Sequence, residues 1–245
     1  MINVNEPQPR TGCQDMWNAF MVKDASFTLG SDIPFCPCTA EDIPQKLISY
    51  VEAKHIHKTM IKKDPDYHVD AYVHFYIDDQ KFCGSKSSIW LYPYKALDIL
   101  HHFSGIITPD FSTFSDFPDA IKRYNTYRMR AFGYWMTTNG ISVINNVRWG
   151  TAETWEYCFD GLPCNSIVAI GTVASKIRLL ENRPLFETGL KEMIRLLHPH
   201  TIIVYGSANY FFFDELRQLG INIIAFESDT SLAFSSKKKG GVKHE

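Results

Sequence analysis

The chain has 245 residues, with 25 Lys and Arg against 27 Asp and Glu, for a formal net charge of −2 at pH 7. This balance argues against bulk, sequence-independent binding of nucleic acid. No stretch approaches the ~18 uninterrupted apolar residues of a spanning helix, and residues 1–10 hold no apolar signal core. We therefore expect a cytoplasmic protein that does not enter a membrane.

Residues 1–70 are expected to form an N-terminal elaboration of the body rather than a separate domain. Within them, Thr39 offers an N-cap for a helix over 42–57, where apolar residues recur at helical spacing. Residues 71–79 are rich in β-forming side chains and predict the first convincing strand, which ends in Asp78 and Asp79. A further short strand is expected at 89–92.

Strands and helices alternate regularly from Gly105 onward. Apolar strands are predicted at 106–109, 141–147, 165–172, 201–205 and 221–226, with the main helices at 116–139, 184–197 and 209–219. Such alternation is typical of a parallel sheet covered by helices. We expect an incomplete or distorted parallel β/α barrel, with an open doubly wound sheet as the alternative. Residues 1–234 would form a single α/β domain and 235–245 a disordered basic tail.

Polar side chains follow nearly every predicted strand. In β/α folds, ligands bind at the carboxyl ends of the strands, where loops are free of packing duties. These positions hold Asp78, Asp79, Asp110, Ser112, Thr113, Arg148, Trp149, Thr172, Ser175, Tyr205, Ser207, Glu227 and Ser228. They predict a shared ligand or active site, and ordinary solvated loops are the alternative interpretation.

The carboxylates at these strand ends suggest a particular chemistry. Asp78, Asp110 and Glu227 are candidate ligands for a divalent cation such as magnesium, which prefers hard oxygen ligands. Metal-assisted hydrolysis or transfer on a phosphorylated or nucleotide-like substrate would follow. Asp110, Arg148 and Glu227 are then the candidate catalytic residues. The candidate ligand-binding residues are Arg128, Ser112, Trp149, Thr172, Tyr205 and Ser207. No metal-ligand spacing accompanies the acids, so turn and cap roles remain the alternative.

Arg128 stands out on the helical wheel of residues 117–139 because it falls among apolar side chains. A buried guanidinium needs a carboxylate or a ligand anion, since an unpaired buried charge is costly. We expect an ion pair with a strand-end acid such as Asp110, with ligand contact as the alternative. Lys122, Arg123 and Arg130 share a separate face that we expect to be solvated.

Cysteines and aromatic residues leave two questions open. Cys36 and Cys38 are too close for a usual zinc or redox pair, although a cluster with Cys83 in three dimensions is compatible with the sequence. Aromatic residues make up 14% of the chain. They either fill the core or supply exposed anchors for a partner; this second set comprises Trp17, Trp90, Trp149, Trp155 and Phe211 to Phe213.

Several segments together resemble the "domain of unknown function 4417" family over residues 15–228. They are Pro109-Asp-Phe-Ser-Thr-Phe, the helix with Arg123-Tyr124 and Trp135, Val147-Arg-Trp-Gly, Phe159-Asp-Gly-Leu-Pro-Cys-Asn-Ser and Ile203-Val-Tyr-Gly. That family occurs in bacteria, their phages and mobile elements, so the resemblance implies a genomic context, a host-cytoplasmic location if phage-encoded, and no catalytic assignment. Two functions remain: the enzyme described above, or a non-catalytic phage factor that binds a host protein or sequesters a ligand.

Overall fold

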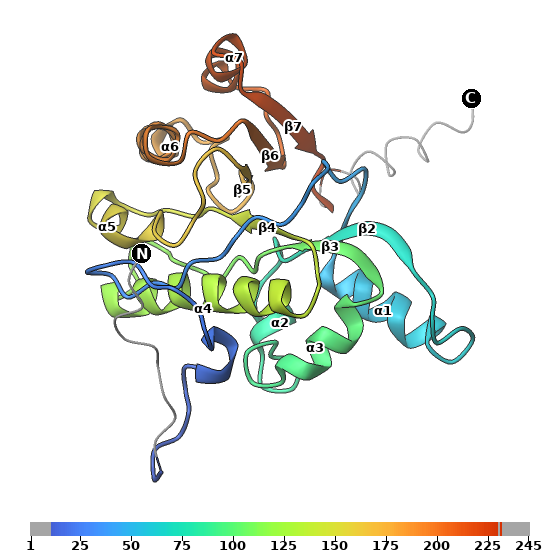
Figure 1. Ribbon diagram of the computed structural model, residues 1–245. Helices are drawn as coiled ribbons and strands as arrows, with labels where there is room; N and C mark the ends of the chain where they lie inside the picture. Colours follow the sequence, from blue (N-terminus) through green and yellow to red (C-terminus); the bar gives the residue numbers. More distant parts are fainter. Residues whose placement is uncertain (1–10, 230, 232–245) are drawn as a thin grey trace, which may run out of the picture.

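The computed structural model describes residues 11–229 and residue 231. Seven parallel strands form one sheet, and each strand pairs with its neighbours in sequence, in the order β1-β2-β3-β4-β5-β6-β7. Their bounds are β1 (Leu47–Ser49), β2 (Val69–His74), β3 (Phe103–Ile107), β4 (Val143–Asn146), β5 (Ile167–Gly171), β6 (Thr201–Tyr205) and β7 (Asn222–Phe226). The sheet curls into a half-barrel (Figure 1).

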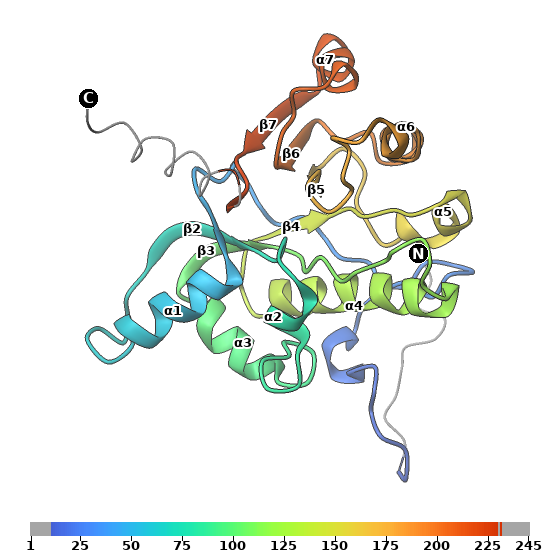
Figure 2. The same cartoon turned by 180° about the vertical axis from the view of Figure 1, so that it is seen from behind.

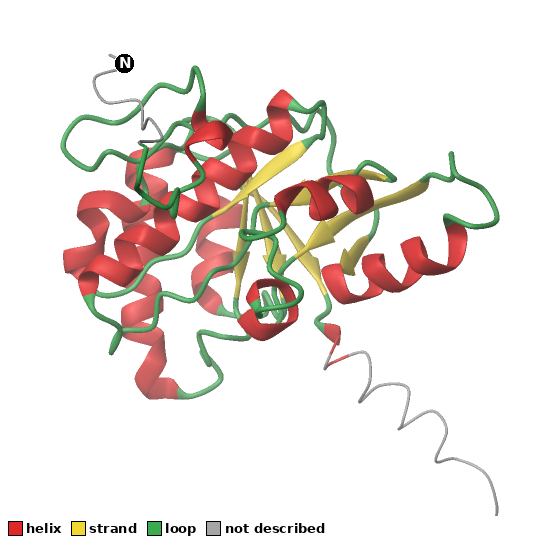
Figure 3. Ribbon diagram, turned by 90° about the horizontal axis from the view of Figure 1, so that it is seen from below, coloured by secondary structure: helices red, strands yellow, loops and turns green. Residues whose placement is uncertain are grey.

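Helices cover the outside of this curl (Figures 1 and 3). They are α1 (Tyr50–Met60), α2 (Asp79–Cys83), α3 (Pro93–Leu100), α4 (Asp119–Thr138), α5 (Trp155–Cys158), α6 (Arg183–Leu197) and α7 (Phe211–Gln218), with short 3-10 helices η1 (Ala19–Val22), η2 (Ala152–Thr154) and η3 (Leu180–Asn182). Crossovers between parallel strands are right-handed, so a sequential strand order keeps the helices on one face. The incomplete barrel is confirmed. The doubly wound alternative is wrong, because it requires the strand order to reverse.

Two apolar clusters fill the space between the helices and the convex face of the sheet. One packs residues such as Val73 and Ile106 against Phe132 of α4. The other packs residues such as Val168 and Ile202 under α6 and α7. The N-terminal arm lies on the other side of α4 (Figure 2), and η1 contacts that helix. Consequently α4 is covered from two sides.

The concave face holds a third cluster, built from alternate residues of the strands. Its buried members are Tyr72, Ile107, Ile144, Ile167, Ala169 and Ile203. The segment 36–46 crosses the amino ends of the strands: Thr39 donates its N–H to the Val143 carbonyl at 3.0 Å, and Asn145 donates from Nδ2 to the Cys36 carbonyl at 3.0 Å. This segment lies across the amino end of the half-barrel, where it lines a cavity of about 870 Å³ together with Tyr72, Ser142 and Thr201.

Two local predictions need correction. The helix expected at 42–57 starts later, because Leu47 and Ile48 pair with Tyr72 and Val73 of β2 and so form the first strand. Part of the predicted N-terminal elaboration thus belongs to the sheet itself. Residues 89–92 form turns and no strand, since Ser88 Oγ accepts the backbone N–H groups of the next turn. The predicted tail, 235–245, lies outside the described residues.

Candidate functional site

A cavity of about 870 Å³, here called the central pocket, lies at the carboxyl end of the half-barrel. Its lining includes residues at or just after the ends of all seven strands. In strand order these include Ser49, Tyr76, Asp78, Asp79, Asp110, Ser112, Arg148, Gly171, Tyr205, Ser228 and Asp229. Segments far apart in the sequence therefore converge at one end of the sheet.

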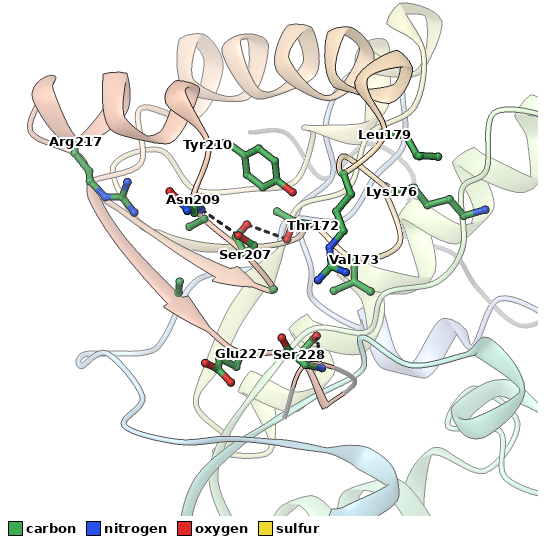
Figure 4. A pocket seen from close by; sticks show the side chains of 15 residues that line it. Thr172, Val173, Lys176, Leu179, Ser207, Asn209, Tyr210, Arg217, Glu227 and Ser228 are labelled. Carbon is green, nitrogen blue, oxygen red and sulfur yellow. Dashed lines mark hydrogen bonds between the residues drawn. The ribbon is translucent and has the colours of Figure 1, made fainter. Parts of the chain in front are cut away.

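Two smaller cavities adjoin it. The lateral pocket, about 700 Å³, is lined by the segments that follow β5, β6 and β7 (Figure 4), and it shares Val173 and Ser228 with the central pocket. The third, about 280 Å³, lies beside Trp149 and shares Asp110 and Arg148 with the central pocket. The three cavities therefore lie next to one another at the carboxyl end of the sheet.

The central feature of this end is an ion pair between Asp110 and Arg148. Arg148 Nη1 lies 2.6 Å from Asp110 Oδ2, and the two side chains are only 16% and 11% exposed. Arg148 Nε also donates to Thr113 Oγ1 at 3.1 Å. No residue in the described part of the chain accepts a hydrogen bond from Arg148 Nη2. The guanidinium is therefore fixed in place and keeps donors for an anion.

Asn146 connects this ion pair to the floor of the pocket. Its Nδ2 donates to Asp110 Oδ1 at 2.9 Å, and its Oδ1 accepts from Tyr76 Oη at 3.0 Å. Burial, followed by the nearby charge of Asp110, raises the pKa of Tyr76 well above its ordinary value. The Tyr76 hydroxyl therefore stays protonated and donates into the network. Asp110, which accepts from two partners, serves as an anchor for Arg148.

Stacked rings form the floor. Tyr76 and Tyr205 lie with their ring centroids 4.9 Å apart and their planes within 12°. Gly171 makes room for them, because a Cβ there would lie 3.0 Å from Tyr76 Cδ1. Below them His74 packs 4.4 Å from the Tyr205 ring, and burial lowers the pKa of His74 to about 3. The floor is thus aromatic and uncharged at neutral pH.

Acidic side chains outnumber basic ones in the lining of the central pocket. Asp79 accepts from the backbone N–H of Ser112 at 3.1 Å and from its hydroxyl at 2.8 Å, which ties the loop after β2 to the loop after β3. Four carboxylates line the central pocket, those of Asp78, Asp79, Asp110 and Asp229, together with the basic side chains of Lys81 and Arg148. The lining therefore carries a formal charge of −2. An anionic ligand would need a cation or a local donor to bind here.

The structure divides the predicted site residues among these cavities. Five of them line the central pocket: Asp78, Asp110, Ser112, Arg148 and Tyr205. Three line the lateral pocket: Thr172, Ser207 and Glu227. The predicted metal ligands are thus split, with Glu227 in a different cavity from the two aspartates. Across residues 11–229 and 231, no group of three His, Cys, Asp or Glu side chains is placed to hold a metal ion.

Trp149 is largely a packing residue. Its ring lies 5.1 Å from the Phe186 ring, and a Cβ on Gly189 of α6 would fall 2.1 Å from Trp149 Cδ1. Thr172 also has a structural role: its hydroxyl donates to the Ser207 carbonyl at 3.2 Å. Both side chains shape the site walls through contacts within the protein.

The ion pair predicted between Arg128 and Asp110 is wrong. Arg128 donates from Nη1 to Cys83 Sγ at 3.3 Å and from Nη2 to Asn125 Oδ1. Its guanidinium lies 4.0 Å from the centroid of the Phe111 ring, and the rings of Tyr124 and Trp90 are also near. Aromatic faces take the place of the expected carboxylate, and Arg128 lines none of the three cavities.

The solvated face predicted for Lys122, Arg123 and Arg130 is also wrong. Arg130 is completely buried and Lys122 is 7% exposed, while Arg123 is half-buried over the Tyr157 ring. Arg130 donates to three backbone carbonyls, including that of Asn146 at 3.1 Å. The helical wheel of residues 117–139 gave the wrong prediction because α4 packs against other elements on both sides.

Most of the aromatic residues considered as partner anchors are packed. Trp90, Phe212 and Phe213 are buried, and Trp17, Trp149 and Trp155 are partly buried. Phe211 is the exposed member, at 58%.

All six cysteines are free thiols, and Cys36 is buried while Cys83 contacts Arg128.

The sequence reasoning missed Tyr76 and Asn146. Tyr72, His74 and Tyr76 are alternate residues, so they face the same side of the sheet. This period of two in the sequence could have placed Tyr76 on the concave face. Asn146 is a buried polar residue at the end of an otherwise apolar strand, which was a second signal. The basic residues Arg178 and Arg217 gave no signal, because nothing in their local sequence shows that they approach a common cavity.

Together these observations define a singly wound α/β half-barrel protein with cavities at the carboxyl ends of its strands. The chain belongs to the family described as "Domain of unknown function (DUF4417)", which matches residues 25–227. This confirms the resemblance seen in the sequence. None of the described helices is long and apolar enough to cross a membrane.

Phage proteins are among its relatives. The chain is 33% identical over 138 residues to "Gene 1 protein" of Mycobacterium phage L5, and 32% identical over 138 residues to "Gene 1 protein" of Mycobacterium phage D29. Each match covers 56% of this chain, and 58% and 49% of the two relatives. The chain therefore spans about half the length of these curated relatives. No solved structure gives a significant match.

Proposed function

We propose that the chain is a hydrolase or transferase that acts on a phosphorylated or nucleotide-like substrate in the central pocket. The observation that supports this best is Arg148, which is held by Asp110 and Thr113 while Nη2 has no partner in the described residues. A planar guanidinium fixed in this way matches the geometry of phosphate oxygens. Arg148 would bind the phosphate and stabilise the charge that develops on it during reaction.

The rings around the same pocket suit a planar group on the substrate. Tyr76, Tyr205, Phe114 and Phe117 all contribute to its lining. Phe114 is 46% exposed and lies 5.5 Å from the Arg148 guanidinium. Aromatic faces beside a guanidinium favour stacking of a base or similar ring, which is the reason for proposing a nucleotide-like molecule.

The acidic walls suggest that a divalent cation enters with the substrate. Mg²⁺ is commonly held by one or two carboxylates together with substrate phosphates. Asp78 is exposed in the pocket lining and is our candidate carboxylate, whereas Asp110 is engaged with Arg148 and Asn146. Such a cation would offset the negative lining and polarise the phosphate.

Turnover of a panel of nucleotides in the presence of Mg²⁺ or Mn²⁺ tests this function. We expect Arg148→Gln and Asp110→Asn to lower kcat/KM by roughly 10²–10³-fold, the range seen when a charge-stabilising donor is lost. Arg195→Gln is the matched control, since Arg195 is an exposed residue of α6 that pairs with Glu192. Unchanged turnover in Arg148→Gln or Asp110→Asn would contradict the assignment. Saturable binding without turnover would instead identify a ligand-sequestering protein.

A further inference from the structure

The lateral pocket differs in charge from the central pocket beside it. Three basic side chains and one acidic side chain contribute to its lining, a formal charge of +2; they are Lys176, Arg178, Arg217 and Glu227. The central pocket carries −2. Neighbouring cavities of opposite sign select for ligands whose charge is distributed to match, because potentials focus in clefts.

The basic side chains come from two different connections. Lys176 and Arg178 lie in the loop after β5, and Arg217 lies on α7 after β6. Figure 4 labels Lys176 and Arg217 on these two connections. Within the described residues, no ion pair engages Lys176 or Arg178. Arg217 pairs with Asp214 at 2.6 Å, but both side chains are exposed, at 41% and 62%. Exposed pairs contribute little to stability, so a phosphate can compete for this guanidinium.

The loop between these basic groups follows a fixed path. Gly206 has φ +111°, and a Cβ there would lie 2.4 Å from Thr172 Oγ1, so only glycine fits. Asn209 donates its N–H to Ser207 Oγ at 3.2 Å, and the Thr172 hydroxyl binds the Ser207 carbonyl (Figure 4). The amino end of α7 follows directly and adds a partial positive charge to the same wall.

A single ligand can reach both cavities. They share Val173 and Ser228, and the lateral pocket's volume of about 700 Å³ is within the usual range for small-molecule sites. A phosphate on Arg148 in the central pocket leaves the lateral pocket available for a second anionic group. Ser207 and Tyr210 place hydroxyl groups in the same lining.

We propose that the lateral pocket binds a second phosphate, so that the substrate is a nucleotide-like molecule with two separate phosphate groups. This inference rests on the proposed function, which places the first phosphate at Arg148. Arg178 and Arg217 are the principal contacts of the second phosphate. Glu227, which follows β7, is the acidic residue among the lining residues of this pocket (Figure 4).

Inorganic pyrophosphate tests the lateral pocket without assuming a base. Calorimetric titration of the full chain should show saturable binding that weakens at least tenfold in Arg178→Gln/Arg217→Gln and less than twofold in Arg148→Gln. Lys62→Gln/Lys63→Gln is the matched control, because it removes the same charge from exposed positions before β2, at the amino end of the sheet. Circular dichroism would verify that each variant is folded.

The outcomes separate the two proposals. Absent pyrophosphate binding, equal loss in the lysine control, or loss confined to Arg148→Gln would each overturn the lateral phosphate site. In a second titration, adenosine 3′,5′-bisphosphate should bind at least tenfold more tightly than adenosine 5′-monophosphate, and Arg178→Gln/Arg217→Gln should abolish that preference. A preference that survives in this variant also contradicts the inference. The proposed function is judged separately, by the effect of Arg148→Gln on nucleotide turnover.

Discussion

Arg130 has no exposed surface, yet backbone carbonyls surround its guanidinium where a carboxylate is the usual partner. Nε, Nη1 and Nη2 donate to the carbonyls of Asp160, Asn146 and Cys158 at 3.2, 3.1 and 3.0 Å. Burial lowers the pKa of Arg130 to about 10, so it remains charged at neutral pH. One side chain thus joins α4, the end of β4 and the loop after α5.

At the residue scale, we expect Arg130→Met to lower the free energy of unfolding by about 3–5 kcal/mol, because three buried carbonyls lose their donor. Arg130→Lys should be intermediate, since an ammonium cannot reproduce the fork of donors. Urea denaturation of both variants would measure this. Arg195→Met, on the exposed face of α6, is the control and should leave the midpoint unchanged. A midpoint for Arg130→Met equal to that of the control would contradict the account.

Glycine residues allow neighbouring elements of this fold to pack closely against each other. Gly189 of α6 is the clearest case, because its missing side chain accommodates the Trp149 ring that follows β4. Trp149 in turn packs against Phe186 and Phe159. The contact fixes α6 against the carboxyl end of β4, directly beside Arg148.

At the element scale, Gly189→Ala should destabilise the protein despite the better helix propensity of alanine. The propensity gain is at most about 1 kcal/mol, whereas overpacking typically costs about 1–3 kcal/mol, and here the overlap is severe. Thermal unfolding and tryptophan fluorescence would record the loss and the displacement of Trp149. Thr188→Ala, one residue earlier and exposed, is the propensity control. A stability of Gly189→Ala equal to or above that of wild type would disprove the close contact.

The whole molecule is a half-barrel whose concave face is lined by apolar and aromatic side chains and one buried histidine. His74 Nδ1 accepts the backbone N–H of Tyr76 at 3.2 Å, so the ring is neutral with the proton on Nε2. Its pKa is about 3 in the folded chain and about 6.5 when unfolded. Between pH 3 and pH 6.5, His74 is therefore protonated in the unfolded chain and neutral in the folded chain.

At this scale we predict that acid weakens the fold through His74. Its contribution to stability is complete above pH 6.5 and is lost as the pH falls from 6.5 towards 3. At pH 5 the loss amounts to about 2 kcal/mol. His74→Gln should flatten the pH dependence of the unfolding free energy between pH 7 and 5 by that amount. His55→Gln, at an exposed position of α1, should not. Identical pH profiles for His74→Gln and wild type would refute the prediction.

The order of the strands and helices, and the end of the sheet at which polar residues gather, follow from the local amino-acid pattern. Short apolar strands separated by helices dictate parallel strands, and the carboxyl ends of parallel strands meet at one edge. Asp110 and Arg148 were placed together for this reason. The family was also legible from local motifs such as Val147-Arg-Trp-Gly, and residues 25–227 match it.

Which charged side chains face each other depends on the three-dimensional packing of the elements. Glu227 follows β7 and lines the lateral pocket, whereas Asp78 follows β2 and lines the central pocket, although both residues lie at the carboxyl end of the sheet. Arg128 packs against aromatic rings and Arg130 is fully buried. Neither environment was predicted, because α4 is covered on two sides and a helical wheel assumes one buried face. The opposite charges of the central and lateral pockets arise from side chains on separate loops and helices. Their approach depends on how the sheet curls, a property that no local stretch of sequence encodes.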